Sequence, residues 1–352
     1  MNTVAAPAED MLPRDCTFDP ADWRILAAHW YPVALVRDLD TGPVSAKLLD
    51  ERLVVYRVHG QIVVAQELCP HRGVPLSMGR NDGEGVVCAY HGLRFGAEGR
   101  CTSIPSTSDP KIPARLHLKT YPAIEQYGLV WTRLRSDPLP DAFAAEPICP
   151  MPHWEDSDFQ QIVCPSLDIF GFAGRQLEGF LDVAHFAFVH AATFGDPGNT
   201  NVPPYRPEPH PTGFEAKYRS NVGNYPIGVD RGRDGFEWLR HFNAHLPFTA
   251  TLTIHFPDNK RLVIMNAASP VSARVTRLFA PIARNFDKEL PIQDVYDFNR
   301  RVFEEDKAIV ETQMPECLPL DPAMEAHIPA DVSSIAYRKG LRSLGLSRFF
   351  TA

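Results

Sequence analysis

The chain has 352 residues, which is enough for two domains with separate cores. Its 44% hydrophobic and 22% charged residues are ordinary for a globular protein, and a net charge of −8 gives no electrostatic basis for binding nucleic acid. The N-terminus lacks the basic region and apolar run of a secretory signal, and no apolar stretch reaches the roughly 20 residues that cross a bilayer. We therefore expect a cytoplasmic protein with no membrane partner.

The first 30 residues are expected to form an N-terminal arm and a helix, because Asp19 and Pro20 are typical of an N-cap and a first helical position. Residues 31–145 are expected to form a small antiparallel β domain. In this stretch, runs rich in β-branched and aromatic residues alternate with Gly, Pro and Asp. The clearest runs begin at Leu53, Gln61 and Gly128.

Five prolines between residues 138 and 152 indicate a domain boundary, and residues 146–352 are expected to form a second domain. A strand is predicted over residues 161–170 and a helix over 175–189. Several long strands are predicted between residues 215 and 285, followed by an amphipathic helix over 292–313 and a last helix over 332–344. A run of strands flanked by helices predicts an α+β domain.

The seven cysteines are an odd number spread over a long chain, which does not predict a disulfide scaffold. Five of them have no His or Cys at ligand spacing and are expected to be free thiols: Cys16, Cys101, Cys149, Cys164 and Cys317. The other two each stand shortly before a histidine.

These two form the segments Cys69-Pro-His71 and Cys88-Ala-Tyr-His91, each of which supplies one thiolate and one imidazole. Neighbouring glycines and prolines suit tight loops that close around a metal. A Cys₂His₂ zinc site uses the same ligand types, but zinc fingers usually pair Cys with Cys and His with His. Mixed pairs suit a binuclear cluster in which sulfur ligates one iron and nitrogen the other. Simple packing of the four residues in turns is the third alternative.

This pattern resembles the Rieske signature. The resemblance implies a [2Fe–2S] cluster in which Cys69 and Cys88 bind one iron and His71 and His91 bind the other. Imidazole ligands raise the reduction potential above that of an all-thiolate cluster.

A second group of candidate ligands lies in the segment from Glu178 to His190. Asp182 and His185 are three residues apart, so in a helix they share one face. His190 is five residues beyond His185, about 140° round an ideal helix. Both histidines therefore reach one metal only if the helix distorts or ends near residue 189.

Two histidines need one carboxylate to complete the 2-His-1-carboxylate triad of non-heme Fe(II) oxygenases. The amphipathic helix near the C-terminus offers three: Glu304, Glu305 and Asp306. The residues alone do not choose among them, and solvated surface charges are the alternative for all three. For the two histidines, the alternative is ordinary core packing.

Both groups, in this order, resemble the Rieske non-heme iron oxygenases over nearly the whole chain. The fold implied is α+β, with an N-terminal antiparallel β Rieske domain and a C-terminal helix-grip catalytic domain, a sheet covered by helices. The resemblance implies that His185, His190 and Asp306 bind a mononuclear Fe(II). It also implies that Asp182 is catalytic, as a bridge that bonds His185 and reaches His91 of a neighbouring subunit.

The activity implied is that of the terminal oxygenase of a multicomponent system, with one cluster and one Fe(II) per chain. It uses O₂ and electrons from an NAD(P)H-dependent reductase or ferredoxin, since the chain has no Gly-x-Gly-x-x-Gly nucleotide fingerprint. The length resembles that of α-only homotrimers, which favours hydroxylation or oxidative demethylation of a small aromatic substrate. The alternatives are a ring cis-dihydroxylating dioxygenase and, outside the enzymes, a Rieske electron-transfer protein.

Two further features bear on the site. Gly179 stands where many relatives have an Asn, which puts the hydrogen bond of that Asn in doubt. Six phenylalanines are candidates for the lining of an apolar pocket, with core packing as the alternative: Phe170, Phe172, Phe180, Phe186, Phe188 and Phe194.

Overall fold

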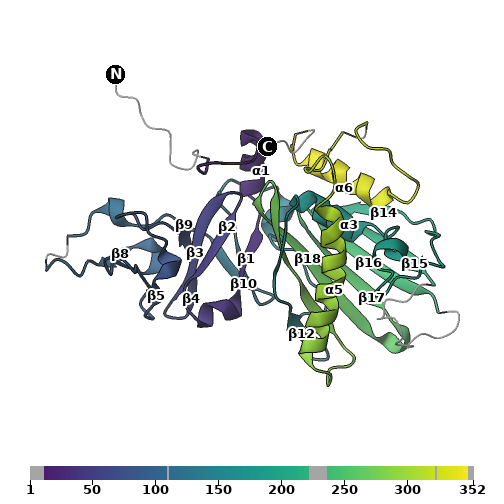
Figure 1. The fold of residues 1–352 in the computed structure, drawn as a ribbon, viewed down its shortest axis with the longest axis horizontal. Coiled ribbons are helices and arrows are strands. Elements are labelled where there is room, and N and C mark those ends of the chain that lie inside the picture. Colours follow the sequence, from purple (N-terminus) through teal and green to yellow (C-terminus); the bar gives the residue numbers. More distant parts are fainter. Residues whose placement is uncertain (1–11, 109–110, 222–235, 322, 348–352) are drawn as a thin grey trace. The chain divides into compact units, whose positions relative to one another are not determined.

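The computed structural model of the chain describes residues 12–108, 111–221, 236–321 and 323–347. The chain divides into two compact units, Met1–Pro138 and Leu139–Ala352, each with its own sheets (Figure 1). Among the helices in these ranges, none combines the length and the apolar character that a bilayer crossing requires.

The first unit opens with helix α1 (Pro20–Ala27), which begins where the sequence predicts. Asp19 Oδ1 accepts the backbone N–H of Ala21 at 2.8 Å and Pro20 takes the first helical position. A capping oxygen and a proline whose missing N–H is not needed both favour a helix start. The helix buries Trp23 and Leu26 in the core of the unit.

Antiparallel strands form three small sheets in the described part of the first unit. Their orders are β1 (Tyr31–Leu35), β11 (Leu129–Thr132), β10 (Ala123–Gln126); then β2 (Val44–Leu48), β3 (Glu51–Val58), β4 (Gln61–Gln66), β9 (Thr120–Tyr121); then β5 (Arg80–Asn81), β6 (Val86–Val87), β7 (Arg94–Phe95), β8 (Cys101–Ser103). Short 3₁₀ turns connect them at Val36–Asp40, Leu76–Met78, Ala97–Gly99 and Ala114–Leu116.

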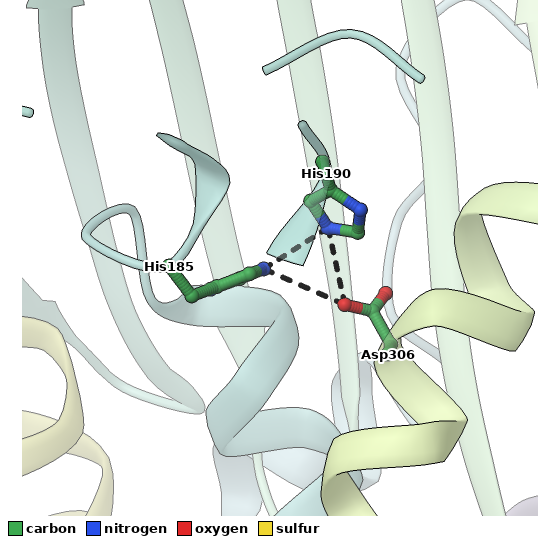
Figure 2. Close-up of side chains that lie close together, drawn as sticks. All are labelled: His185, His190 and Asp306. Atoms are coloured by element: carbon green, nitrogen blue, oxygen red, sulfur yellow. Dashed lines mark hydrogen bonds and ion pairs between the residues drawn. The ribbon is translucent and has the colours of Figure 1, made fainter. Parts of the chain in front are cut away.

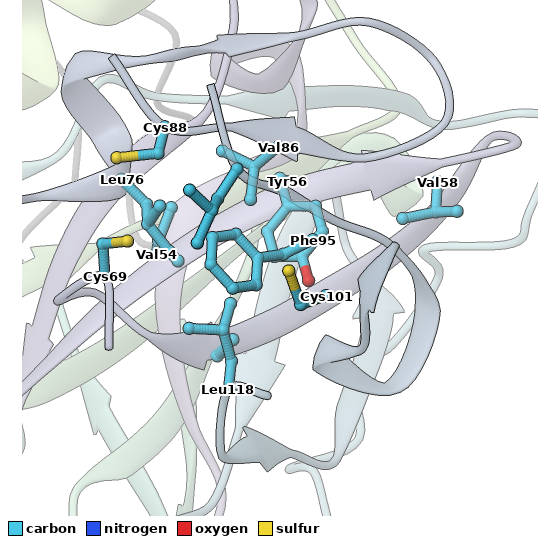
Figure 3. Close-up of a cluster of buried hydrophobic side chains, with 12 residues drawn as sticks. Val54, Tyr56, Val58, Cys69, Leu76, Val86, Cys88, Phe95, Cys101 and Leu118 are labelled. Atoms are coloured by element: carbon cyan, nitrogen blue, oxygen red, sulfur yellow. The ribbon is translucent and has the colours of Figure 1, made fainter. Parts of the chain in front are cut away.

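The second and third of these sheets enclose a cluster of buried apolar side chains (Figure 3). Tyr56 and Phe95 are completely buried in it. Cys69 and Cys88 belong to the same cluster and lie side by side at one edge (Figure 3). The core therefore gives both thiols a rigid, dry support.

The second unit is built on one nine-stranded antiparallel sheet. Its main order is β12 (Gln160–Val163), β20 (Pro281–Arg284), β18 (Arg261–Ser272), β17 (Thr249–His255), β16 (Trp238–His245), β15 (Gly213–Ser220) and β14 (Pro207–His210). In addition, β19 (Val275–Phe279) pairs with β18, and β13 (Leu167–Ile169) pairs with β19. The described helices are α2 (Asp141–Ala145), α3 (Ala173–Leu181), α4 (Phe186–Val189), α5 (Ile292–Val310) and α6 (Val332–Ser343), and a 3₁₀ turn spans Pro257–Asn259.

Side chains alternate between the two faces of this sheet, as the period of a strand requires. In β15 every second residue is buried, from Phe214 to Ser220. Phe242 of β16 points to the face covered by helices, because its ring meets that of Phe180 in α3, with centroids 6.1 Å apart. Figure 1 shows α5 running across this covered face. The predicted α+β class, with antiparallel β structure first and a helix-covered sheet second, is confirmed.

Two predicted elements of the second unit are interrupted. The strand expected over residues 161–170 is two strands, β12 and β13, which pair with different partners, β20 and β19. The helix expected over 175–189 ends at Leu181 and resumes only as the single turn of α4. The prediction of one continuous helix is therefore wrong, whereas the two C-terminal helices appear as α5 and α6 close to their predicted bounds.

A buried ionic network holds α3 against α6. The Arg338 guanidinium donates to both carboxylate oxygens of Glu178 at 2.6 and 2.8 Å, and Arg175 pairs with Glu325 at 2.6 Å. Buried charges are tolerated only when paired in this way. The network fixes the helix that leads directly into the residues around Asp182.

Candidate functional site

The two Cys–His segments form loops with the same backbone pattern. In the first loop, the Cys69 N–H donates to the Val74 carbonyl oxygen at 3.0 Å, and the Gly73 N–H donates to the Cys69 carbonyl oxygen at 2.9 Å. The second loop repeats both bonds at 2.9 and 3.0 Å, from Cys88 to Leu93 and from Gly92 to Cys88. Gly73 and Gly92 have φ angles of 70° and 71°, a conformation that glycine adopts without steric cost.

The loops present sulfur to the interior and imidazole to the surface. Cys69 and Cys88 are each 3% exposed and their side chains hydrogen-bond, whereas His71 and His91 are exposed with ring centroids 4.6 Å apart. Burial raises the pKa of the Cys69 thiol to about 11. Binding to a metal cation favours the thiolate form of such thiols, and the iron ions of an iron–sulfur cluster are cations of this kind. The four side chains therefore fit the cluster that the sequence pattern predicts.

A second convergence of side chains lies in the second unit (Figure 2). The Nε2 atoms of His185 and His190 are 3.1 Å apart. Asp306 Oδ1 lies 3.5 Å from the first and 3.1 Å from the second. The structure thus brings together three residues that are up to 121 positions apart in the chain, from His185 to Asp306.

The break after α3 places His185. Asp182 adopts an extended conformation, with ψ of 138°, and its Oδ1 accepts the N–H of Ala184 at 2.8 Å. An Asp side chain that bonds the backbone two residues on favours a turn over a helix. The other oxygen, Oδ2, lies 3.2 Å from His185 Nδ1. The two residues therefore meet across a turn and not along a helical face.

The chain after α4 wraps around the backbone of His190. Its carbonyl oxygen accepts three N–H groups, those of Thr193, Phe194 and Gly195, at 3.0, 3.1 and 2.8 Å. The imidazole stacks on the Phe194 ring with centroids 4.6 Å apart, and its side chain is 2% exposed. The tight turn thus fixes His190 in a dry position.

Helix α5 provides the carboxylates, and its three acidic candidates point in different directions. Glu304 is half exposed and pairs with Arg300 at 2.8 Å. Glu305 Oε2 lies 2.7 Å from Nδ1 of His190, on the side of the ring away from His185. Asp306 is the one whose oxygen lies near the Nε2 atoms of both histidines.

The three converging atoms fit a divalent metal ion. Metal–ligand bonds of about 2.1 Å at right angles separate neighbouring ligand atoms by about 3.0 Å, close to the observed 3.1–3.5 Å. Burial opposes a charge on Asp306, but the bonds from both histidines outweigh it and lower its pKa, so the carboxylate is ionised. One carboxylate and two imidazoles on one side of an ion form a facial triad, the donor set of non-heme iron oxygenases.

Next to the triad lies a cavity that is partly open to solvent. A mainly apolar lining with few polar groups is typical of sites for small organic molecules. Among the residues that the structure describes, the polar one in the lining besides the triad is Asn299, whose Nδ2 donates to the Val295 carbonyl oxygen at 2.9 Å. The apolar residues of the lining lie in three places: in the segment that runs from α3 to Phe194, in the sheet, and in α5. They are Phe180, Phe186, Phe194, Leu252, Leu262, Ile264, Phe298, Val302 and Phe303.

The six candidate phenylalanines divide into three groups. Phe180, Phe186 and Phe194 line the cavity. Phe172 is completely buried against Phe248, so it belongs to the core. The remaining two, Phe170 and Phe188, are 66% and 69% exposed and line nothing in this cavity.

Apart from Asp306, the cavity residues of α5 and those of the sheet were not predicted from the sequence. Asn299, Phe303 and Asp306 follow one another at helical spacing, so the amphipathic pattern of the predicted helix already places them on one stripe. No local signal assigns Leu252, Leu262 or Ile264 to the cavity, because every second residue of a covered strand is apolar. At Gly179, a Cβ atom would meet nothing within 4 Å, and nothing in the structure explains the glycine.

Two family models match the chain, one in each unit. Residues 29–122 match the Rieske [2Fe–2S] domain, and residues 174–346 match the C-terminal domain of the vanillate O-demethylase oxygenase. The candidate cluster residues fall in the first match and the triad in the second.

Whole-length relatives are also found. The chain is 31% identical over 335 residues to the methylxanthine N1-demethylase NdmA of Pseudomonas putida, covering 91% of this chain and 89% of that protein. It is 29% identical to the methylxanthine N3-demethylase NdmB of the same organism, covering 93% and 91%. The solved structure of NdmA with caffeine is similar with a TM-score of 0.79 at 29% identity, covering 91% of this chain and 92% of that one.

The turn around His190 depends on Gly195. A Cβ atom there would lie 2.1 Å from the Phe186 carbonyl oxygen and 2.9 Å from the His190 carbonyl carbon, so the backbone must move. We expect Gly195→Ala to lower the free energy of unfolding by about 1–3 kcal/mol, measured by chemical denaturation. The control is Gly198→Ala in the same loop, where the added atom meets only the Asp196 side chain, at 3.2 Å. Equal stabilities of the two variants would contradict the expectation.

Proposed function

The chain belongs to the Rieske non-heme iron oxygenases, and from this premise we propose that it removes a methyl group from nitrogen on a small heteroaromatic substrate. Membership makes it the terminal oxygenase of a multicomponent system, with a [2Fe–2S] cluster and a mononuclear iron as cofactors. Electrons come from a separate reductase or ferredoxin. Membership in this family rules out the two alternatives, a zinc-binding module and a simple electron carrier.

One observation carries the choice of substrate class. Among the described residues, the cavity beside the triad is lined by aromatic and aliphatic side chains and by one neutral amide, that of Asn299. Such a lining favours a flat, uncharged ring with one or two hydrogen-bonding groups over a carboxylate, for which these residues offer no Lys or Arg. Methylxanthines, the substrates in the names of NdmA and NdmB, have this chemistry. An N-methylated purine or a similar heteroaromatic compound is therefore the proposed substrate class.

The roles proposed for individual residues follow from the two groups of side chains that the structure brings together, the Cys–His loops and the triad. Cys69 and Cys88 would hold one iron of the cluster, and His71 and His91 the other. The mononuclear iron would be held by the triad: His185, His190 and Asp306. When bound, this iron supplies the activation of O₂ for oxidation of a C–H bond.

The protein side chains bind and orient the substrate. Phe186 and Phe194 exclude water beside the triad, and Asn299 fixes the ring through its amide. The methyl group then faces the open side of the triad. Its C–H bond becomes C–OH, and the N–CH₂OH product breaks its C–N bond to release formaldehyde and the N–H compound. The second oxygen atom of O₂ leaves as water, with two electrons from the donor and two protons.

The test is product analysis with N-methylated and O-methylated aromatics, with an NAD(P)H-dependent reductase as electron source. We expect substrate-dependent O₂ uptake and one formaldehyde per N-methyl group lost. Asn299→Leu should raise KM for the N-methylated substrate roughly 5- to 30-fold, because a lost hydrogen bond to the ring costs roughly 1–2 kcal/mol. A cis-diol that retains both atoms of O₂ would instead support ring dihydroxylation and would contradict the proposal.

The triad is tested by metal content. We expect Asp306→Ala and His185→Ala to lose one iron of three per chain and to keep the absorbance of the cluster, because the altered residues bind only the mononuclear ion. Iron is measured after anaerobic reconstitution. Glu304→Ala, at the exposed neighbour of the ligand helix, serves as the control and should keep all three. Full iron retention in either triad variant would remove that residue from the ligand set.

We also propose that the working unit is a homotrimer in which Asp182 connects two chains. Its Oδ2 meets His185 Nδ1, its side chain is 28% exposed, and the neighbouring Phe188 is 69% exposed. On the first unit, His91 is exposed beside Tyr90, which is 61% exposed. Exposed apolar side chains at both places favour contact between chains. Dependence on NAD(P)H favours the cytoplasm as the location.

The bridge is tested by Asp182→Asn. The amide keeps the size of the side chain but loses the charge that orients the imidazole and couples the two centres. We expect an unchanged cluster spectrum and product formation reduced by roughly 10- to 100-fold, together with slower reoxidation of the reduced cluster in the presence of substrate and O₂. The control is Asp196→Asn in the exposed loop that follows. Near-normal coupled turnover would rule out the proposed route.

A further inference from the structure

The His190 ring lies between two carboxylates that are adjacent in sequence. Its Nε2 faces Asp306 Oδ1 at 3.1 Å, and its Nδ1 faces Glu305 Oε2 at 2.7 Å. Neighbouring residues of a helix point about 100° apart. One turn of α5 can therefore contact both nitrogens of a ring that stands against it, and both contacts are present here.

A second residue, Thr193, also holds Glu305 in place. The Thr193 hydroxyl donates to the same oxygen, Oε2, at 2.7 Å. Thr193 is 4% exposed and belongs to the turn that wraps the His190 carbonyl group. The Glu305 side chain is 20% exposed. The turn fixes both His190 and Thr193, and both contact Glu305 Oε2. These two contacts therefore hold the Glu305 carboxylate in one position.

We propose that Glu305 is a positioning residue of the mononuclear metal site, which keeps the proton of His190 on Nδ1 and the lone pair of Nε2 directed at the ion. The inference rests on the proposed assignment of His190 as a ligand. An imidazole that donates one N–H to a carboxylate has a fixed tautomer and ring plane and is a better electron-pair donor at its other nitrogen. Asp182 makes the equivalent contact with His185: its Oδ2 lies 3.2 Å from the Nδ1 of that ring.

The two carboxylates differ in their surroundings. Asp182 contacts a histidine whose side chain is 18% exposed, whereas Glu305 contacts one that is 2% exposed. The contact of Glu305 is 0.5 Å shorter than that of Asp182, from 2.7 and 3.2 Å. Glu305 therefore acts on the more buried of the two imidazoles. Its effect should appear in metal affinity and in the geometry of the bound ion.

The experiment measures Fe(II) binding by anaerobic equilibrium titration of the full chain with its [2Fe–2S] cluster intact. Glu305→Gln keeps the size of the side chain and removes its charge, and Glu305→Ala removes the contact. We expect Fe(II) affinity to fall 10- to 100-fold in both. Glu304→Gln, one residue away and paired with Arg300 at the surface, is the matched control and should bind as the unaltered protein does.

A second pair of variants separates positioning from general stability. Thr193→Val removes the hydroxyl that holds Glu305, and Thr193→Ser restores it. We expect the first to weaken Fe(II) binding and the second to recover it. In the Co(II)-substituted protein, the ligand-field bands should shift with Glu305→Gln and Thr193→Val but not with Thr193→Ser or Glu304→Gln. A glutamate that only ties α5 to the loop would leave these bands unchanged.

Several outcomes would overturn the inference. Fe(II) affinity within twofold of the unaltered protein in both Glu305 variants would do so. So would a loss of affinity matched by equal destabilisation of the iron-free chain with no change in the Co(II) spectrum. His190→Ala identifies which proposal fails. Full affinity in His190→Ala overturns the ligand assignment and the role of Glu305 together, whereas lost affinity there beside normal affinity in Glu305→Ala overturns the role of Glu305 alone.

Discussion

The second unit depends on a convergence of electron-pair donors that is unfavourable without a cation. Two imidazole nitrogens and a carboxylate oxygen lie 3.1–3.5 Å apart, and the Nδ1 atoms of both rings face further carboxylates. Burial opposes a proton on His185, but the bonds from Asp182 and Asp306 outweigh it and raise its pKa to about 9. In the metal-free chain a proton therefore offsets the negative charge. A divalent ion does so better, because it also accepts all three donor atoms.

The broken helix is what makes this convergence possible. A continuous helix through residues 175–189 would point His185 and His190 to directions about 140° apart. Asp182 interrupts such a helix by accepting the Ala184 N–H. The carbonyl oxygen of His190 then accepts the N–H groups of the turn that follows. The same carboxylate then orients His185. One side chain thus ends a helix, builds a turn and supports a ligand, so the local fold and the chemistry of the site have a common cause.

The sequence predicted the fold class and offered the candidate ligands because their signals are local. Cys-x-His and Cys-x₂-His segments, the capped α1 and the periodicity of α5 need only a few neighbouring residues. It missed the break at Leu181 because Asp182 follows an apolar helical stripe, and its bond to the backbone competes with the helix only in three dimensions. The residues alone did not choose among Glu304, Glu305 and Asp306, for which the resemblance implied Asp306. In the fold, Glu304 pairs with Arg300 at the surface, whereas Glu305 and Asp306 contact different nitrogens of His190.

Through its register, helix α5 connects the proposed metal site to the cavity beside it. Asp306 faces the two histidines, Glu305 supports one of them, and Asn299 and Phe303 form part of the cavity wall. A shift by one residue would rotate every one of these side chains by about 100°. Two contacts with β13 and the residue after it oppose such a shift: Lys307 Nζ donates to the Asp168 carbonyl oxygen at 2.8 Å, and Glu311 accepts the Phe170 N–H at 2.8 Å. Substrate choice can therefore vary along the stripe from Asn299 to Phe303 while these anchors, one turn further on, keep the ligand geometry constant.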